Sequence, residues 1–271
     1  MVSVRERYDT DLTEVEMLLL EPLIPPAKAG GRHRSTDMRE VLNAIFYQLR
    51  SGCAWRLLPH EFPVWQTVYG YFRTWRIKGV WQAMNDALRQ AVREYEERDA
   101  DASAAIVDSQ TVKTTEAAVD DRGYDGAKQT TGRKRFILVD VLGLLLTIFV
   151  TKGSVPERDG AQQMLEQTSP EILKQLELLW ADGGFSGPDF ATWVHKHCGA
   201  LVEIVKRPDD AKGFVVLPRR WVVERTLAWL SRFRRLSKDY ERLAQTSQAW
   251  IYAAMVRIML QRLSKDPSVY C

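Results

Sequence analysis

Residues 219–236 read RRWVVERTLAWLSRFRRL, and the spacing of their apolar side chains predicts a helix with two different faces. At about 100° of rotation per residue, the apolar side collects Val222, Thr226, Trp229, Leu230, Phe233 and Leu236. Glu224 falls on the opposite side, near Arg220 and Arg235. The simplest interpretation is a salt-bridged helix face, in which Glu224 pairs with Arg220 one turn away. Whether this carboxylate does more depends on the other acids of the chain.

The composition is that of a globular protein with one strongly basic region. The chain has 271 residues, 45% of them hydrophobic, which is enough for one large core or two smaller ones. Its net charge is only +3, yet residues 219–265 contain eleven lysines and arginines against three acids. A local basic surface of this kind indicates an acidic partner such as nucleic acid.

The cysteines and the apolar runs set expectations about the compartment. Three cysteines without a Cys-x-x-Cys pair are typical of a reducing cytoplasm. The N-terminus is charged and does not resemble a signal peptide. The longest nearly apolar run, residues 136–150, is too short to cross a bilayer as a helix. We therefore expect a cytoplasmic protein without a membrane span.

Residues 1–98 are predicted to form an all-helical domain. Helices are expected at 12–23, at 37–49 and from Pro63 onward, and the last of them presents four polar residues outward: Gln66, Thr67, Arg73 and Arg76. Short helices joined by glycine-containing turns are typical of a helix-turn-helix module that reads DNA. A plain helical or dimerising domain has the same pattern and stays an alternative. The charged segment 89–101 marks the predicted boundary.

Residues 99–271 are predicted to form an α/β domain. Strands are expected at residues 103–108, 135–142, 144–150, 176–181 and 201–205. Helices are expected at residues 157–167, 188–197, 219–236 and 250–263. The two runs around Gly143 indicate a hairpin, and Asp140 is interpreted as part of it. An antiparallel hairpin followed by βαβ units predicts a mixed β-sheet flanked by helices.

Two aspartates stand at the ends of predicted strands. Asp108 closes the run IVD, and Asp182 follows LLWA directly and precedes two glycines. At the carboxyl ends of strands, both side chains would project into the crevice where open α/β sheets bind ligands. With Glu224 on a helix packed beside them, three carboxylates would meet, and such a group requires a cation to stay ionised. Taken singly, an aspartate in such a place is more often a turn former or helix cap, and the three acids together carry the prediction.

Oxygen ligands of this kind suit Mg²⁺ or Mn²⁺. Two such ions serve phosphodiester chemistry, because one activates the attacking oxygen while the other stabilises the leaving oxygen. The predicted cofactor is therefore a pair of Mg²⁺ (or Mn²⁺) ions in one active site.

The chain resembles the DDE transposases of bacterial insertion sequences, of the insertion-sequence-five kind. The resemblance covers essentially the whole chain and rests on IVDSQTVK around Asp108, DGGF from Asp182, and WVVERTLAWL followed by RFRRLSKDYE. It implies an RNase H-like catalytic domain, residues 99–271, behind a helical DNA-binding domain, residues 1–98. It also implies that Asp108, Asp182 and Glu224 are the catalytic, metal-binding triad.

The resemblance further implies a phosphate-binding residue that this chain does not have at the usual position. The wider superfamily carries a Tyr, Arg, Glu, Lys signature on the helix of Glu224 and Arg220. Here Leu217 stands in place of Tyr and Ser231 in place of Lys. Arg235 is the replacement that we expect to hold the terminal phosphate.

Other candidates for DNA binding flank the predicted site. The segment YDGAKQTTGRKR, residues 124–135, predicts a loop that grips DNA phosphates, although a solvated charged loop has the same composition. Its basic residues are Lys128, Arg133, Lys134 and Arg135. Trp221 is a candidate for stacking on an unpaired base, with core packing as the alternative.

The expected function is therefore DNA transposition. Residues 1–98 would bind the terminal inverted repeats of an insertion sequence, and the catalytic domain would hydrolyse the phosphodiester at the element ends. The freed 3′-hydroxyl would then be joined to target DNA. The partner is double-stranded DNA, the protein is expected to be a homodimer or higher oligomer, and it would lie at the bacterial nucleoid. Two alternatives are an RNase H-like nuclease with the same metals and a non-catalytic DNA-binding regulator.

Overall fold

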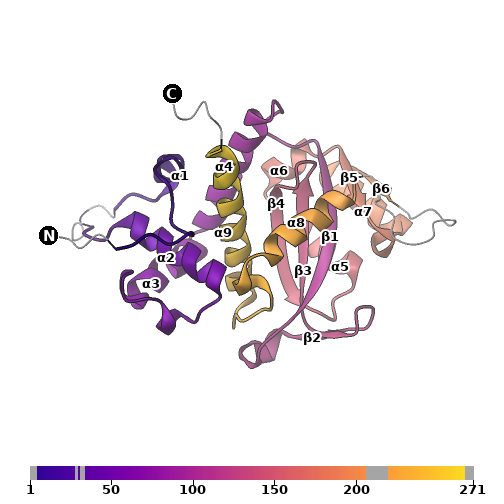
Figure 1. Ribbon diagram of the computed structural model, residues 1–271. Coiled ribbons are helices and arrows are strands. Elements are labelled where there is room, and N and C mark those ends of the chain that lie inside the picture. Colours follow the sequence, from indigo (N-terminus) through magenta and orange to yellow (C-terminus); the bar gives the residue numbers. More distant parts are fainter. Residues whose placement is uncertain (1–4, 28–29, 31–33, 206–218, 266–271) are drawn as a thin grey trace.

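The computed structural model describes residues 5–27, 30, 34–205 and 219–265. Figure 1 shows a group of helices from the first part of the chain on one side and a β-sheet with its own helices on the other. The C-terminal helix lies between them. None of the helices that the model describes is long and apolar enough to cross a bilayer.

The helices before the sheet are α1 (Glu14–Leu20), α2 (Met38–Ser51), α3 (Trp65–Ile77) and α4 (Val80–Tyr95), with 3₁₀ turns at Glu21–Leu23 and Trp55–Leu57. α1 begins with a capping box, in which the Thr13 hydroxyl and the Glu16 carboxylate each accept the other residue's backbone N–H. α2 begins at the predicted cap, Asp37, and ends at Gly52, whose φ of 74° is left-handed.

Helix α4 is an element that the sequence analysis did not predict. Its inner face carries Trp81, Met84, Leu88 and Val92 at helical spacing. The charged segment from residue 89 looked like a boundary, but it continues this helix to residue 95. The reason is that Arg93 is buried and paired, with its guanidinium 2.7 Å from the Asp140 carboxylate.

The sheet contains β1 (Ala104–Lys113), β2 (Gly123–Asp125), β3 (Thr130–Asp140), β4 (Leu145–Lys152), β5 (Leu178–Ala181) and β6 (Leu201–Ile204). Its order is β2-β3-β1-β5-β6, with β4 also paired to β3. β1, β3 and β4 are antiparallel, whereas β1, β5 and β6 are parallel. The mixed sheet flanked by helices is thus confirmed, and so is the β3–β4 hairpin, where Asp140 accepts the N–H groups of Leu142 and Leu144.

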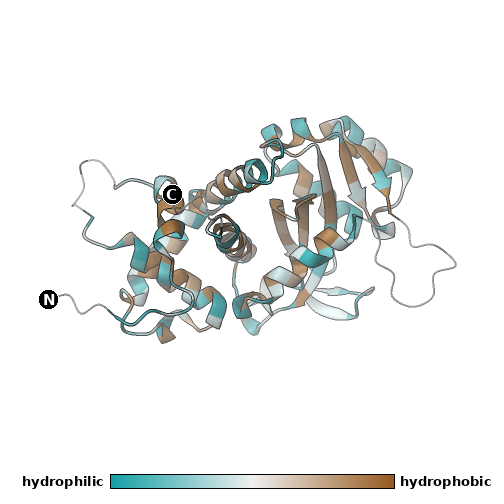
Figure 2. Ribbon diagram, turned by 45° about the horizontal axis from the view of Figure 1, so that its top comes forward, coloured by the Kyte–Doolittle hydropathy of each residue, from teal (hydrophilic) through white to brown (hydrophobic). Residues whose placement is uncertain are grey.

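Each face of the sheet packs against a different set of helices. On one face, Val107, Phe136 and Leu138 pack in a core with α5 (Glu157–Glu166), α6 (Pro170–Gln175) and α7 (Pro188–Cys198). On the other face, Ile106 and Ile137 join the core that contains α8 (Trp221–Ser231), α9 (Ala244–Leu263) and the helices before the sheet. Apolar residues accordingly gather on the strands and on α9 (Figure 2).

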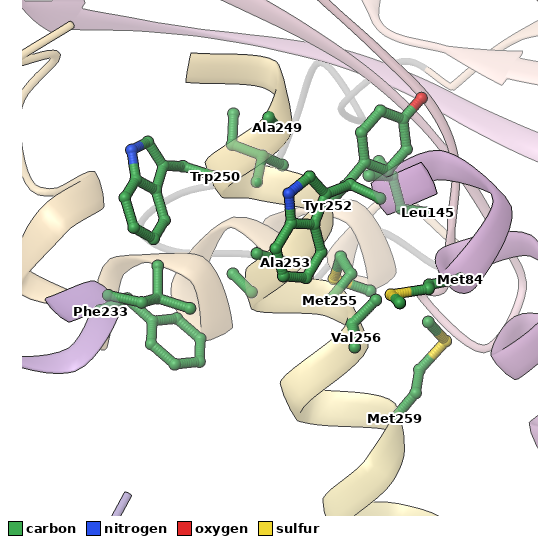
Figure 3. Close-up of a cluster of buried hydrophobic side chains, with 14 of the residues drawn as sticks. Met84, Leu145, Phe233, Ala249, Trp250, Tyr252, Ala253, Met255, Val256 and Met259 are labelled. Carbon is green, nitrogen blue, oxygen red and sulfur yellow. The ribbon is translucent and has the colours of Figure 1, made fainter. Parts of the chain in front are cut away.

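Helix α9 is buried on nearly every side. It begins at Ala244, six residues earlier than predicted from the apolar run at 250–263. Trp250 stacks on Phe72 of α3 at a centroid distance of 4.2 Å, while Tyr252 and Met255 are also buried in the shared core (Figure 3). A helix that is apolar all around belongs in the middle of a protein, and α9 joins the helical part to the sheet.

The helix predicted over residues 219–236 is shorter than expected. α8 ends at Ser231, and Phe233 then takes an extended backbone conformation, with φ −92° and ψ 113°. A 3₁₀ turn, Arg234–Leu236, follows. This break separates Arg235 from the helix that carries Glu224, although helical spacing would have placed the two on one face.

Two helical glycines should respond in opposite ways to alanine. A Cβ at Gly160 of α5 would lie 2.1 Å from the buried Phe136 ring, whereas a Cβ at Gly70 of α3 would meet nothing within 4 Å. Gly160→Ala should lower the free energy of unfolding by about 1–3 kcal/mol through overpacking. Gly70→Ala should raise it by ~0.5–1 kcal/mol, since alanine favours helix. Urea denaturation measures both, and equal effects would contradict the packing at Gly160.

Candidate active site

Asp108 lies in the middle of β1, not at its end as predicted. The strand continues because its second half pairs with β3. On its other side, β1 pairs with β5 over residues 104–106. β5 ends one residue after the last of these pairs, and the same parallel register, continued by one more residue, brings Asp182 beside Asp108. β5 therefore ends beside Asp108, and beyond that point β1 continues in its pairing with β3.

Asp182 directly follows β5, as predicted. Its carboxylate accepts the backbone N–H of Gly184 at 2.8 Å and so caps the 3₁₀ turn Gly183–Phe185. The cap uses Oδ1, while Oδ2 faces Arg220 at 3.7 Å. Asp182 is thus both the turn former that its glycines indicated and a carboxylate that reaches a second partner.

Glu224 lies in the first turn of α8, and contacts at both sides of that turn fix its position. Before it, Arg219 pairs with Glu203 of β6 at 3.3 Å and lies over the Trp180 ring of β5 at 4.6 Å. After it, the Thr226 hydroxyl donates to the carbonyl oxygen of Gly143 at 2.8 Å, at the tip of the β3–β4 hairpin. α8 is therefore attached to both the parallel and the antiparallel parts of the sheet.

Arg220 is the cation that two of the predicted carboxylates share. Its Nη2 lies 3.3 Å from Glu224 Oε1 and 3.7 Å from Asp182 Oδ2. The salt bridge expected within the helix is therefore present, and it extends to the end of β5. Among the described residues, no three His, Cys, Asp or Glu side chains lie close enough together to hold a metal ion.

The third carboxylate, Asp108, is the most perturbed of the set. Burial raises the pKa of Asp108 to about 6, and the negative charge of Asp182 adds to this effect. A hydrogen bond from the Ser109 N–H and the positive charges of Arg220 and Lys128 oppose it. Asp108 therefore experiences the charges of Asp182 and Arg220, and Arg220 in turn pairs with Glu224.

The donor set fits a hard divalent cation by its chemistry. All three groups are carboxylates. A cation beside Asp108 would offset both the cost of burying its negative charge and the repulsion from Asp182, which raise its pKa. Arg220 already supplies positive charge to Asp182 and Glu224. The three carboxylates therefore suit a metal by their chemistry, while in this structure Arg220 is the cation that joins two of them.

Lys128 is the member of the predicted basic loop that lies near this site. Its side chain is exposed, and its ammonium group donates to the carbonyl oxygen of Ser109, next to Asp108, at 2.9 Å. The sequence analysis did not single out Ser109. Its place in IVDSQ, directly after Asp108, was the available signal.

The other three residues of that segment correct the prediction of an exposed loop, since all three are buried in β3. Arg133 pairs with Asp239 at 3.2 Å, and Lys134 pairs with Asp125 at 3.3 Å. Burial lowers the pKa of Arg135 to about 10, and its guanidinium donates to two backbone carbonyl oxygens. Because these cations already have partners inside the protein, they are not available to DNA.

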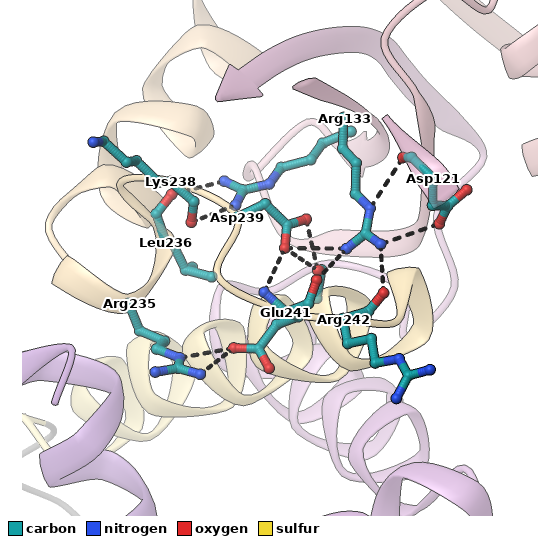
Figure 4. Close-up of polar contacts among 10 residues, drawn as sticks. Asp121, Arg133, Arg235, Leu236, Lys238, Asp239, Glu241 and Arg242 are labelled. Carbon is teal, nitrogen blue, oxygen red and sulfur yellow. Dashed lines mark hydrogen bonds and ion pairs between the residues drawn. The ribbon is translucent and has the colours of Figure 1, made fainter. Parts of the chain in front are cut away.

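Arg235 is likewise not the phosphate-binding replacement that the sequence suggested. It is buried and forms two hydrogen bonds with Glu241, one of them from Nε at 2.8 Å (Figure 4). Figure 4 also shows Arg133 reaching Asp239 and the carbonyl oxygens of Glu241 and Arg242. This network fixes the turn between α8 and α9. Ser231 is exposed, and Leu217 lies outside the described residues.

The remaining candidates differ in exposure. Trp221 is 42% exposed, and the Arg225 guanidinium covers its ring at 4.3 Å, so the core does not enclose it. On α3, Gln66 and Arg73 are exposed, whereas Thr67 and Arg76 are half-buried. These α3 residues lie on the helical part of the protein, away from the sheet (Figure 1).

Comparisons with known proteins agree with the fold. Residues 12–85 match a family described as "Putative transposase of IS4/5 family (DUF4096)", and residues 99–259 match the "Transposase DDE domain" family. A similar protein is the "Insertion element IS402 uncharacterized 16.2 kDa protein" of Burkholderia cepacia. It is 30% identical over 105 residues, which cover 36% of this chain and 70% of that protein. No solved structure matches.

The raised pKa of Asp108 predicts that removing its charge stabilises the fold. The pKa is about 6 in the folded protein against 3.8 for an unperturbed aspartate, so the stability cost of ionisation is absent below about pH 4, grows between pH 4 and pH 6, and is complete above pH 6. Asp108→Asn should raise the free energy of unfolding by roughly 1–2 kcal/mol at pH 7, after allowance for solvent screening. The gain should vanish near pH 4. Denaturant titrations at both pH values measure it, and an equal gain at pH 4 would contradict the assignment.

Proposed function

The chain belongs to the DDE transposase family, whose members cleave DNA and transfer strands, and we propose that it mobilises an insertion sequence. It binds the terminal inverted repeats, hydrolyses the phosphodiester at the element ends and joins the freed 3′-hydroxyl to target DNA. The observation that carries this proposal is the position of Arg220 between Asp182 and Glu224, with Asp108 on the neighbouring strand. These contacts support the proposal that the three acids, far apart in sequence, act at one site.

DDE transposase domains use divalent metals, and the proposed ligands here are Asp108, Asp182 and Glu224, holding two Mg²⁺ (or Mn²⁺) ions. When bound, such ions activate the attacking oxygen and stabilise the leaving one. The chain's own residues prepare this site in two ways. The fixed first turn of α8 positions Glu224. Burial, with a smaller contribution from the charge of Asp182, raises the pKa of Asp108, and a bound cation would offset the cost of its negative charge.

Arg220 and Lys128 are the proposed contacts to the reacting DNA. Both are within reach of the carboxylates without being buried. A guanidinium that leaves Asp182 and Glu224 can bind a phosphate through two parallel hydrogen bonds. The ammonium group of Lys128, beside Ser109 of β1, offers a single positive charge to a phosphate. Trp221, exposed one residue beyond Arg220, is proposed to stack on a base that loses its pairing partner near the cut.

The helical part, residues 1–98, is proposed to recognise the inverted repeats, with residues 99–271 as the catalytic domain. Gln66 and Arg73 of α3 are exposed, and their side chains suit hydrogen bonding to base edges or phosphates. Thr67 and Arg76 lie on the margin of the same surface. Since the two ends of an element must be processed together, the proposed active form contains at least two copies of the chain.

The decisive experiment removes one carboxylate and follows the DNA. Asp182→Asn should lower Mg²⁺-dependent cleavage of a duplex carrying the inverted repeat by at least about 1,000-fold, as expected when a group needed in the transition state is lost. Asp189→Asn is the matched control, because Asp189 is an exposed acid of nearby α7. Cleavage without strand joining by the wild type would instead indicate a nuclease, and binding without cleavage would indicate a regulator.

Metal binding can be measured without any reaction. Mn²⁺ at about tenfold its dissociation constant should raise the free energy of unfolding of the wild type by ~1.4 kcal/mol. Asp108→Asn should lose this increment, although its stability without metal is higher, and Asp189→Asn should keep it. Thermal unfolding with and without Mn²⁺ gives the comparison. An increment that survives Asp108→Asn would exclude Asp108 as a ligand.

A further inference from the structure

A second positively charged feature lies apart from the carboxylates. A groove of about 650 Å³ opens where the N-terminal segment and α2 meet the C-terminal ends of α8 and α9. Five of its lining residues are cations: Arg50, Arg232, Arg257, Arg262 and Lys265. Asp9 is the acid among the lining residues that the structure describes. We call this feature the basic groove.

Most of these cations have no acidic partner. Arg257 is neutralised by Glu16 at 2.7 Å. In the described part of the chain, no carboxylate lies within ion-pair distance of Arg50, Arg232 or Lys265, and all three side chains are exposed. This contrasts with Arg133 and Arg235, whose charges are balanced inside the protein.

Two of the unbalanced arginines are held next to each other. The Arg50 guanidinium donates to the backbone carbonyl oxygen of Arg232 at 2.7 Å, across 182 residues of sequence. This bond holds the Arg50 guanidinium against the C-cap of α8, the residue whose own side chain is a second exposed cation. Exposed cations without a paired carboxylate favour an anionic ligand.

The basic groove is connected to the carboxylates by helix α8. The guanidinium carbon of Arg225 lies 4.3 Å from the ring centroid of Trp221 and 4.6 Å from that of Trp229. The guanidinium carbon of Arg262 also lies over the Trp229 ring, at 4.5 Å. This row of rings and cations runs from the first turn of α8 to the groove. Figure 1 shows α8 crossing the sheet diagonally from β5 toward α9. The helix thus links one end of the sheet to the basic groove.

The separation along α8 matches a short stretch of DNA. Glu224 and Arg232 are eight residues apart, which corresponds to about 12 Å along a helix. That distance spans about three to four base pairs at 3.4 Å each. Both side chains are exposed, one in the first turn of α8 and the other at its C-cap. One duplex can therefore contact both positions.

We propose that the basic groove binds the phosphate backbone of the duplex whose scissile phosphodiester lies at Asp108, Asp182 and Glu224. This inference rests on the proposed function, because it requires DNA at the carboxylates. Arg50, Arg232 and Lys265 supply the charges, and they release counterions from about three phosphates. The groove holds the DNA three to four base pairs from the cut, and it reads no base sequence.

The test measures DNA affinity without divalent metal, so that cleavage plays no part. The full chain is titrated onto a duplex carrying the inverted repeat at several KCl concentrations, with fluorescence anisotropy as the readout. Arg50→Gln/Arg232→Gln should reduce the slope of log affinity against log salt by about 1.8 and weaken binding ~50-fold near 0.1 M salt. Lys265→Gln, a variant outside the Arg50–Arg232 hydrogen bond, should reduce the slope by about 0.9.

The matched control is Lys174→Gln/Lys196→Gln, which removes two exposed cations from α6 and α7 and should change neither quantity. A second measurement locates the contact on the DNA. Neutral methylphosphonates placed three to four nucleotides from the scissile phosphate should weaken the wild type, and they should have little further effect on the double variant. Thermal unfolding of each variant verifies that it folds.

Several results would overturn the inference. If the wild type binds DNA and both groove variants keep its salt slope, the basic groove does not bind DNA phosphates. The proposed function would be unaffected by that result. A groove variant that alters the oligomeric state by sedimentation, but not the slope, makes the groove a surface between proteins. Absence of wild-type DNA binding would count against the proposed function as well.

Discussion

Burial of α9 by both parts of the molecule is the constraint on which the rest of the structure depends. The apolar faces of α1, α2, α3 and α4 turn toward this one helix, and so does the β4 side of the sheet. The shared core leaves little freedom for the helical part to move independently of the sheet. It also fixes where α8 lies, because the chain must return from the end of β6 across the sheet to the start of α9. The position of Glu224 follows from that path.

The polar network around Asp239 fixes the geometry of the turn between α8 and α9. Asp239 accepts hydrogen bonds from Arg133 of β3, from Ser247 of α9 and from the backbone N–H of Glu241. Glu241 in turn holds Arg235. Buried charges of this kind are costly unless every partner is present. The network therefore specifies one arrangement of the turn between α8 and α9, more than it adds to stability.

Local sequence signals predicted the elements whose formation depends on neighbours in the chain. The hairpin at Gly143, the helix cap at Asp37 and the position of Asp182 after a strand were all visible in short segments. The predicted mixed sheet followed from their order. The end of β1 was not predictable in this way, because the strand continues past Asp108 through pairing with β3, and the end of β5, about seventy residues away, sets the position of Asp108 in the sheet. The density of basic residues predicted DNA contacts for Arg133 and Arg235. Both instead form ion pairs inside the protein, and the spacing of residues in the sequence did not identify their acidic partners. The last turn of α4 was taken for a boundary because its buried arginine, Arg93, looked like a surface residue.

The central position of α9 also affects how the chain is made. A ribosome completes α4 about 150 residues before it begins α9, which corresponds to roughly 8–30 s of synthesis. During that interval the first helices can pack on one another, as α3 and α4 do through Trp75 and Trp81, but the faces that α9 covers stay exposed. The nascent chain therefore offers chaperones a prolonged opportunity to bind, and final compaction of the earliest segments waits for some of the last residues to emerge from the exit tunnel.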